Sequence, residues 1–250
     1  MTSRGPAARG SVVRAEEVPA ERAAGGASVR TLLDTGSGAP GLIRRRVDVP
    51  PQSSFSGRAG EAGELWFVIA GTGQLDITGH AGTPLRPDLG LWVPPGSDFR
   101  VLAGEGTDMR LDLVSLPASG EAGAAVSDPD AGPLRSRDLA GCEVETTGDR
   151  QFRVLFGPAR DCAVATQFMG QIPPGRAPEH SHPYDEVVLI LHGHGTAHIG
   201  GVQHALGPGT CLHLPPGLPH CLENTGPAEM RVLGVFHPAN SPAAKLQPDG

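Results

Sequence analysis

The chain has 250 residues, a formal net charge of -7 and a sequence pI near 5.8. This acidic balance argues against nucleic acid or an anionic membrane surface as a partner, and no apolar run is long enough to span a bilayer. With 36 glycines, 25 prolines and short Val/Leu/Ile runs, the composition favours an all-β fold with many turns.

Residues 1–30 are rich in Ala, Gly, Arg and Glu, and they lack the basic-then-apolar order of a secretory signal. We expect them to form a flexible N-terminal arm. The four cysteines of the chain are scattered and show no CxxC spacing. This usage favours free thiols and a cytoplasmic location.

The next segment, 31–117, carries two strand-like runs that each end in a turn: ELWFVIAGTG at 64–73 and LWVPPG at 91–96. Ahead of them stand three consecutive arginines, Arg44 to Arg46, which we interpret as a solvated strand face. Residues 118–133, rich in Ala, Gly, Ser and Pro, are typical of a linker.

Both runs recur in the segment 134–250, as EVVLILHGHG at 186–195 and LHLPPG at 212–217. The two offsets, 122 residues from Glu64 to Glu186 and 121 residues from Pro94 to Pro215, are nearly equal. Internal similarity at a fixed offset predicts a duplicated domain. We therefore expect one domain on each side of the linker.

Four side chains in the second domain have spacings that suit one metal ion. His180 and His182 are two residues apart, so they point to the same face of an extended strand. Glu186 opens a buried-strand run, and His220 follows the Pro-Pro-Gly turn. Neutral imidazoles and a carboxylate are ligands that Fe(II), Mn, Ni, Zn and Cu accept. The pattern predicts one divalent transition metal per chain, bound by His180, His182, Glu186 and His220.

At these residues the sequence resembles the cupin family. The first cupin motif is matched by His180, His182, Glu186 and Gly193, and the second by Gly209, Pro215, Gly217, His220 and Asn224. One spacing departs from the family, because Gly175 leaves four residues before the first histidine instead of the usual five. The resemblance covers about residues 40–238 and implies a bicupin, which is two tandem jelly-roll β-barrels with the metal inside the second.

In the first domain the equivalent positions have lost their histidines. Arg58, Gly60 and Phe99 replace them, and only Glu64 remains. We expect a barrel without metal that supports structure, with Arg58 and Glu64 forming a salt-bridged core. A metal-free binding pocket around these two residues is the alternative.

Other residues of the second domain are candidates for contact with a substrate. Gln167 and Gln171 lie on the strand before the metal motif, where a side-chain amide could hydrogen-bond a substrate. Arg153 could anchor a carboxylate. Tyr184, the only tyrosine, is expected near the mouth of the site. The catalytic candidates are Glu186, Gln167 and Tyr184.

Three histidines and one glutamate leave two positions open on an octahedral ion, unlike the closed shell of a structural site. Similarity to bicupin and quercetinase-like dioxygenases implies an Fe(II)-dependent dioxygenase acting on a small organic molecule, with Glu186 or a histidine outside the ligand set handling protons. A redox-neutral isomerase, hydrolase or decarboxylase using Mn, Ni or Zn stays open. So does a non-catalytic barrel that binds a small ligand. Because cupins often associate through their barrel faces and edge strands, a homodimer is also possible.

Overall fold

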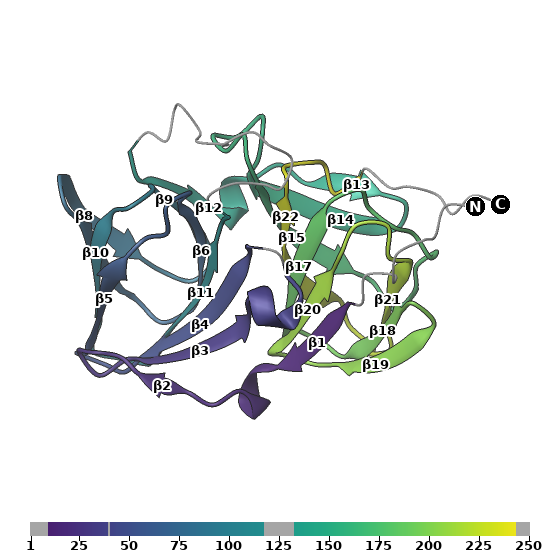
Figure 1. Ribbon diagram of the computed structural model, residues 1–250, viewed down its shortest axis with the longest axis horizontal. Coiled ribbons are helices and arrows are strands. Elements are labelled where there is room, and N and C mark those ends of the chain that lie inside the picture. Colours follow the sequence, from purple (N-terminus) through teal and green to yellow (C-terminus); the bar gives the residue numbers. More distant parts are fainter. Residues whose placement is uncertain (1–9, 40, 118–132, 244–250) are drawn as a thin grey trace.

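The computed structural model describes residues 10–39, 41–117 and 133–243. Two β-barrels lie side by side along the long axis of the molecule (Figure 1). Each consists of a seven-stranded and a four-stranded antiparallel sheet. The sequence prediction of an all-β fold with two tandem jelly-roll barrels is confirmed. In the described residues, no helix is both long and apolar enough to cross a membrane.

The strands of the first barrel are β2 (Glu21–Arg22), β3 (Ser28–Leu33), β4 (Ile43–Val49), β5 (Ser54–Arg58), β6 (Glu64–Ala70), β7 (Gly73–Ile77), β8 (His80–Leu85), β9 (Leu89–Val93), β10 (Asp98–Ala103), β11 (Met109–Ser115) and β12 (Arg135–Asp138). Those of the second are β1 (Ser11–Arg14), β13 (Glu145–Thr147), β14 (Arg150–Phe156), β15 (Thr166–Ile172), β16 (Gly175–Arg176), β17 (Asp185–His192), β18 (Gly195–Ile199), β19 (Val202–Leu206), β20 (Thr210–Leu214), β21 (His220–Asn224) and β22 (Met230–His237). Three short 3-10 helices, η1 (Ala15–Glu17), η2 (Thr35–Ser37) and η3 (Leu139–Gly141), complete the secondary structure.

The two barrels repeat the same strand order. The large sheet of the first runs β12-β9-β6-β11-β4-β3-β2, and that of the second runs β1-β20-β17-β22-β15-β14-β13. The repeated glycines after β6 and β17 also serve the same purpose. Gly71 and Gly193 both have positive φ (78° and 88°), and a Cβ on either would lie within 3 Å of the Cα of Met109 or Met230. Only glycine fits these turns.

Each barrel has one edge strand that lies, in the sequence, beyond the other barrel or beyond the linker. β1 pairs with β20 of the second barrel, and β12, which follows the linker, pairs with β9 of the first. The expected boundaries at 31 and 134 therefore do not coincide with the ends of the barrels. The linker at 118–133 lies outside the described residues, apart from Pro133.

The expectation of a flexible arm over residues 1–30 is wrong for the part that the structure describes. Residues 1–9 lie outside it, but from Gly10 on the segment contributes β1, η1, β2 and the start of β3. The physical reason is that β1 satisfies the free edge of β20, while Val12 and Val13 pack against the cores on its two faces.

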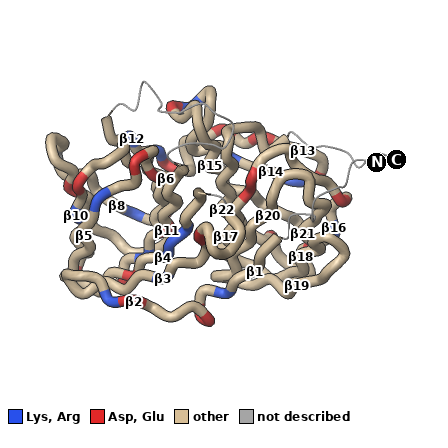
Figure 2. The backbone as a smooth tube through the Cα atoms, in the orientation of Figure 1, with Lys and Arg blue, Asp and Glu red and all other residues tan. Residues whose placement is uncertain are grey.

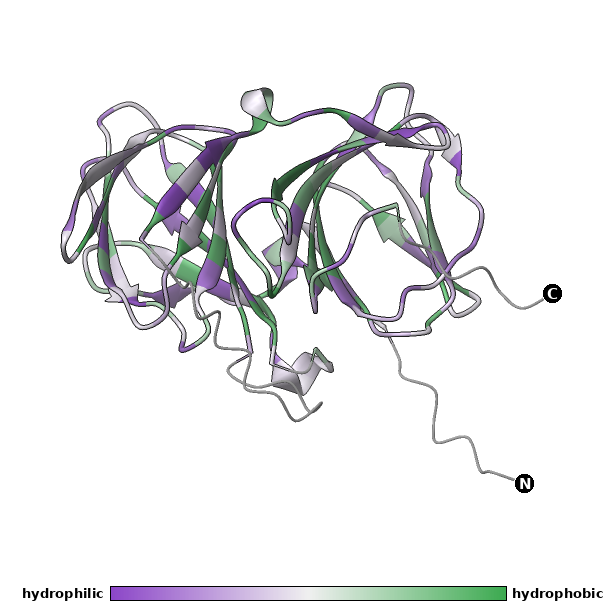
Figure 3. Cartoon of the chain, turned by 90° about the horizontal axis from the view of Figure 1, so that it is seen from above, coloured by the Kyte–Doolittle hydropathy of each residue, from purple (hydrophilic) through white to green (hydrophobic). Residues whose placement is uncertain are grey.

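The large sheets of the two barrels pack against each other and share one hydrophobic core. Figure 3 shows the hydrophobic stretches of both sheets running alongside each other at the centre of the molecule. This inter-barrel core includes Leu33, Leu65, Phe67 and Val114 from the first barrel and Phe156, Met169, Val187, Leu189, Leu233 and Val235 from the second. Charged residues of both signs are spread over both barrels (Figure 2).

The sequence predicted that the three arginines of β4 form a solvated face, but they do not. Arg44 is fully buried in the inter-barrel core, where it forms a bidentate pair with Asp112 at 2.9 and 2.8 Å. Its guanidinium also donates to the carbonyl oxygens of Val187 and Leu233 in the other barrel. The neighbouring Arg45 lies on the opposite face of the strand and reaches into the first barrel.

Candidate metal centre

Two segments of the second barrel bring three histidines together. His180 and His182 precede β17, and His220 is the first residue of β21. Reciprocal backbone hydrogen bonds of 3.0 and 2.8 Å join His180 to His220, and the Gly217 amide donates to the His182 carbonyl at 2.7 Å. As a result, one ring nitrogen from each histidine lies within 4.8 Å of one from each of the others.

The Nδ1 atoms of two of these histidines lie on carbonyl oxygens. His180 Nδ1 is 3.1 Å from the oxygen of Pro178, and His220 Nδ1 is 2.8 Å from that of Leu218. A carbonyl only accepts hydrogen bonds, so each Nδ1 must carry the proton. Each Nε2 then keeps its lone pair, which is the tautomer that a metal ligand requires.

Tyr184 sets the tautomer of the third histidine. Its hydroxyl lies 3.0 Å from His182 Nδ1 and donates to the Ser241 carbonyl at 3.3 Å, so it accepts the Nδ1 proton. The phenol ring also stacks on the imidazole, with centroids 4.8 Å apart and planes at 14°. Tyr184 is 1% exposed. The sequence placed it near the mouth of the site, but it lies behind His182 and is a positioning residue.

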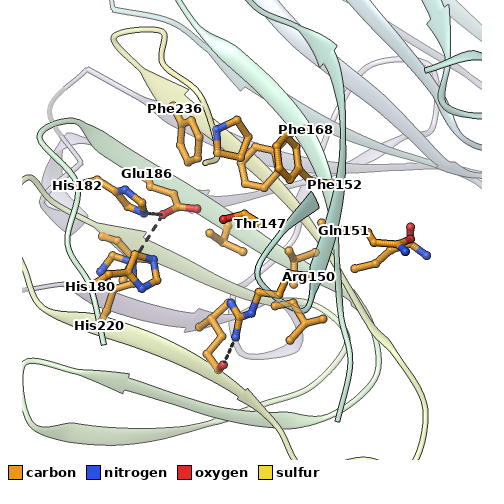
Figure 4. A pocket seen from close by; sticks show the side chains of 18 residues that line it. Thr147, Arg150, Gln151, Phe152, Phe168, His180, His182, Glu186, His220 and Phe236 are labelled. Carbon is orange, nitrogen blue, oxygen red and sulfur yellow. Dashed lines mark hydrogen bonds and ion pairs between the residues drawn. The ribbon is translucent and has the colours of Figure 1, made fainter. Parts of the chain in front are cut away.

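Glu186 faces this cluster from the start of β17. Its Oε2 lies 3.4 Å from His182 Nε2 and 3.8 Å from His220 Nε2 (Figure 4). Burial raises the pKa of Glu186 to about 8, against the opposing field of Arg150. Burial of this carboxylate is unfavourable unless a cation compensates its charge. Together with three imidazole nitrogens that present lone pairs, it forms a donor set suited to a divalent transition metal. The residues therefore fit such an ion.

A cavity of about 80 Å³ adjoins the four side chains. One wall is aromatic and consists of Phe152, Phe168 and Phe236, and Arg150 and Thr147 lie on another (Figure 4). The strand β15 lines the cavity with Phe168, Gly170 and Ile172. Of the alternate residues of β15, Gln167 and Met169 do not line it, as expected for a strand, whereas Gln171 does.

Gln167, predicted as a catalytic candidate, does not line the cavity. Its side chain points to the first barrel, where Nε2 donates to the Trp66 carbonyl at 3.3 Å. The sequence argument assumed that the polar residues of this strand face the cavity. The face of β15 that carries Gln167 is instead covered by the first barrel. Met169 on the same face belongs to the inter-barrel core.

The remaining polar candidates of this region divide between the cavity and the outer face. Gln171 lines the cavity near its edge and donates to Glu229 at 3.0 Å. Arg153 is not among the lining residues, and its Nη1 donates to Gln171 Oε1 at 3.4 Å. Arg150, three residues earlier on the same strand, does line the cavity. Sequence reasoning missed Arg150, although it has the same parity as the inward Phe152.

The retained glutamate of the first barrel has other partners than expected. Glu64 accepts hydrogen bonds from Arg45 at 2.8 Å, Ser115 at 2.6 Å and Trp66 Nε1 at 2.6 Å. The predicted pairing with Arg58 is wrong, because Arg58 pairs with Asp98 on the exposed edge of the barrel. Neutralised by Arg45 and held by two further donors, Glu64 stabilises the core of the first barrel.

Four of the other histidines have partners or exposure of their own. His213 lies 2.7 Å from Asp185, and His198 lies 2.8 Å from Glu223. His192 and His194 are exposed at the end of β17 and in the turn after it. All four cysteines are buried, and none of them forms a disulfide. Among the described residues, His180, His182 and His220 form the one cluster with metal-ligand spacing.

Comparison with known proteins finds the same fold. A family model described as a cupin domain matches residues 168–236, which contain all four proposed ligands. No curated protein matches the sequence.

Solved structures similar to this chain cover nearly all of it. A putative glyoxylate induced protein from Pseudomonas aeruginosa is 14% identical with a TM-score of 0.76, covering 96% of both chains. Protein Ylba from E. coli is 13% identical with a TM-score of 0.74, covering 92% of this chain and 91% of that one. A variant of oxalate decarboxylase from Bacillus subtilis is 13% identical with a TM-score of 0.74, covering 97% and 80%. The chain has a cupin fold, with the matched cupin domain in the second of two jelly-roll barrels.

Proposed function

We propose that the second barrel is the active site of a metal-dependent enzyme that acts on a small organic molecule. The observation that carries this proposal is the convergence of one ring nitrogen from each of three histidines beside a buried glutamate, at the wall of a cavity. His180, His182, Glu186 and His220 would hold one divalent transition metal. Three nitrogens and one carboxylate do not fill an octahedral shell, so room for a substrate remains.

The residues around the cavity would have distinct tasks. The metal, when bound, supplies Lewis-acid or oxygen-activating chemistry. Tyr184 keeps the Nδ1 proton of His182 in place, so that Nε2 stays available as a ligand. Glu186 can hold or release a proton at Oε2. The aromatic wall of Phe152, Phe168 and Phe236 keeps water away from the reacting groups.

Fe(II)-dependent dioxygenation is our first candidate reaction. Two open coordination positions would admit a substrate and O2 together, and the phenylalanine wall offers O2 an apolar environment. A redox-neutral reaction with Mn, Ni or Zn is the second candidate. The likeness to an oxalate decarboxylase from Bacillus subtilis supports this second candidate.

Metal content tests the site itself. Protein expressed in minimal medium is loaded with Fe(II) under argon, or with Mn or Zn, and assayed by elemental analysis. We expect one ion per chain, and less than about a tenth of that in His182→Ala and His220→Ala. Glu64→Gln in the first barrel and His198→Gln are controls that should keep full occupancy. Two ions per chain, or full occupancy in both alanine variants, would refute the proposed ligand set.

Turnover then separates the reaction classes. The loaded protein is incubated with a panel of small organic acids and alcohols, with and without O2, while oxygen uptake and products are measured. Consumption of O2 that depends on Fe(II) supports dioxygenation. Turnover without O2 supports the redox-neutral reaction. Tight binding without turnover under either condition would identify a non-catalytic binding barrel and overturn the proposed enzyme.

A further inference from the structure

Arg150 lies in the wall of the metal cavity, at the start of β14. Its Nη2 donates to the Leu222 carbonyl at 2.7 Å, which fixes the direction of the guanidinium. Figure 4 shows Arg150 in the same cavity as the three histidines and Glu186. The remaining N–H groups of its planar fork are able to bind a second partner.

No carboxylate of the described residues forms a hydrogen bond or an ion pair with Arg150. Most arginines of the described residues that form a side-chain hydrogen bond or ion pair do have a carboxylate partner, for example Arg44 with Asp112 and Arg45 with Glu64. Burial lowers the pKa of Arg150, and Asp149, Cys221 and Glu186 oppose this only through their more distant fields. A cation that is partly removed from water gains most from an anionic partner.

The charge of the proposed centre points the same way. A divalent ion, the Glu186 carboxylate and the Arg150 guanidinium together carry an excess of positive charge. The other lining groups, such as Thr147, are neutral or apolar. An anionic ligand would reduce this excess, whereas a neutral one would leave it uncompensated.

We propose that Arg150 binds the carboxylate of the substrate, and that the enzyme therefore acts on small organic acids. This inference rests on the proposed function, because it places the substrate in the same cavity as the metal. A guanidinium and a carboxylate match in a bidentate geometry that a neutral amide cannot reproduce with the same strength. A cavity of about 80 Å³ suits an acid of few non-hydrogen atoms.

The test uses glycolate and its neutral analogue glycolamide as probes. Binding to Zn-loaded protein, which is redox-silent, is measured by isothermal titration calorimetry. We expect Arg150→Met to weaken glycolate binding by about tenfold or more, which is the usual effect of losing a charge-assisted hydrogen-bonded pair. Arg150→Lys should lose less, because it keeps the charge without the fork. Neither variant should change the weak binding of glycolamide.

Arg153→Met is the matched control. It removes the same charge from the same strand, but Arg153 binds Gln171 and does not line the cavity. It should bind glycolate as the wild type does. Equal glycolate affinity in wild type and Arg150→Met would overturn the proposal, and so would an equal loss in Arg153→Met.

Metal content distinguishes a failure of this inference from a failure of the proposed function. If the wild type binds Zn at one ion per chain and Arg150→Met does not affect glycolate, only the substrate assignment fails. If the wild type binds no metal, the proposed function fails. The comparison of glycolate with glycolamide on metal-free wild type then tests Arg150 alone. The same comparison serves if Arg150→Met does not fold, and equal binding of the two probes would then reject the role.

Discussion

At the scale of single residues, the proposed centre depends on where three Nδ1 protons are held. Two of them lie on backbone carbonyls, which no substitution of a side chain can remove. The third lies on the side-chain hydroxyl of Tyr184. Tyr184→Phe is therefore the substitution that loosens one ligand without changing the ligand set.

We expect Tyr184→Phe to lower metal affinity by about tenfold, within the range that the loss of a partner behind a ligating histidine causes. The ring should still stack on His182, so the fold should be kept. Competition with a chromogenic chelator measures the affinity for Zn. His198→Gln, whose histidine bonds Glu223 and lies on the opposite face of β18 from the core residue Ala197, is the control. An unchanged affinity in Tyr184→Phe would show that the hydroxyl has no role in holding the ligand.

The last residue of β22 should make the stability of the chain depend on pH. Burial lowers the pKa of His237 below its ordinary value of 6.5, with Asp185 opposing. The folded chain thus binds fewer protons at this site than the unfolded chain does, and the free energy of unfolding falls as the pH drops through 6.5.

This dependence should be weaker in His237→Gln. Urea unfolding of metal-free protein at about pH 7.5 and about pH 5.5 brackets the ordinary pKa of histidine. The loss of stability between the two pH values should be larger in the wild type than in the variant. The exposed His192→Gln should behave as the wild type does. An identical loss in wild type and His237→Gln would contradict the assigned direction.

The residues of the site were predictable to different degrees. The three histidines and Glu186 match the two motifs of the family that the sequence resembles, so the sequence predicted that they lie together. The prediction that Gln167 faces the cavity failed, because strand alternation assigns residues to two faces but does not show which face points inward. For β15 the answer depends on the other barrel, which covers the face that a single barrel would expose to water. Arg150 carries no motif, and only the closed barrel places it in the cavity.

At the scale of elements, the exchanged strand β1 is the largest departure from expectation. Its four residues, SVVR, stand in a segment rich in Ala and Gly, and a run this short gives no reliable strand pattern. The duplicated barrel strands were predictable because each is repeated at nearly the same offset. β1 and β12 have no such signal, since their role depends on the free edges of β20 and β9.

Removal of β1 should destabilise the second barrel. We expect a chain without residues 1–14 to lose about 2–4 kcal/mol of stability, because Val12 and Val13 are each mostly buried and a fully buried valine contributes about 1.5–3 kcal/mol. Denaturant unfolding measures the loss, and a chain without residues 1–9 is the control, since it keeps β1. Equal stability of the two truncated chains would mean that the strand adds nothing.

At the scale of the whole molecule, the first barrel supplies a wall for the second. The sheet that carries Glu186 on β17 has its other face in the inter-barrel core, with Val187 and Leu189 packed against the first barrel. A barrel without metal ligands would thus be retained because it keeps water from this face and makes the sheet rigid. The buried pair of Arg44 and Asp112 is the polar part of this contact.

Breaking the pair should cost far more than replacing it. Arg44→Met leaves the Asp112 carboxylate buried and unpaired, and we expect a loss of about 3–5 kcal/mol in the free energy of unfolding. In Arg44→Met/Asp112→Leu no charge is stranded, so the double variant should be more stable than the sum of the single changes predicts, by about 2 kcal/mol. A double-mutant cycle in urea measures this coupling.

The exposed pair of Arg58 and Asp98 provides the matched cycle in the same barrel. Both of its side chains are about two-thirds exposed, so the equivalent coupling there should be below about 1 kcal/mol. Similar couplings at the two pairs would mean that the inter-barrel core does not exclude water around Arg44. In that case the carbonyls of Val187 and Leu233 would gain little from its guanidinium, and the two barrels would be held together by their apolar surfaces alone.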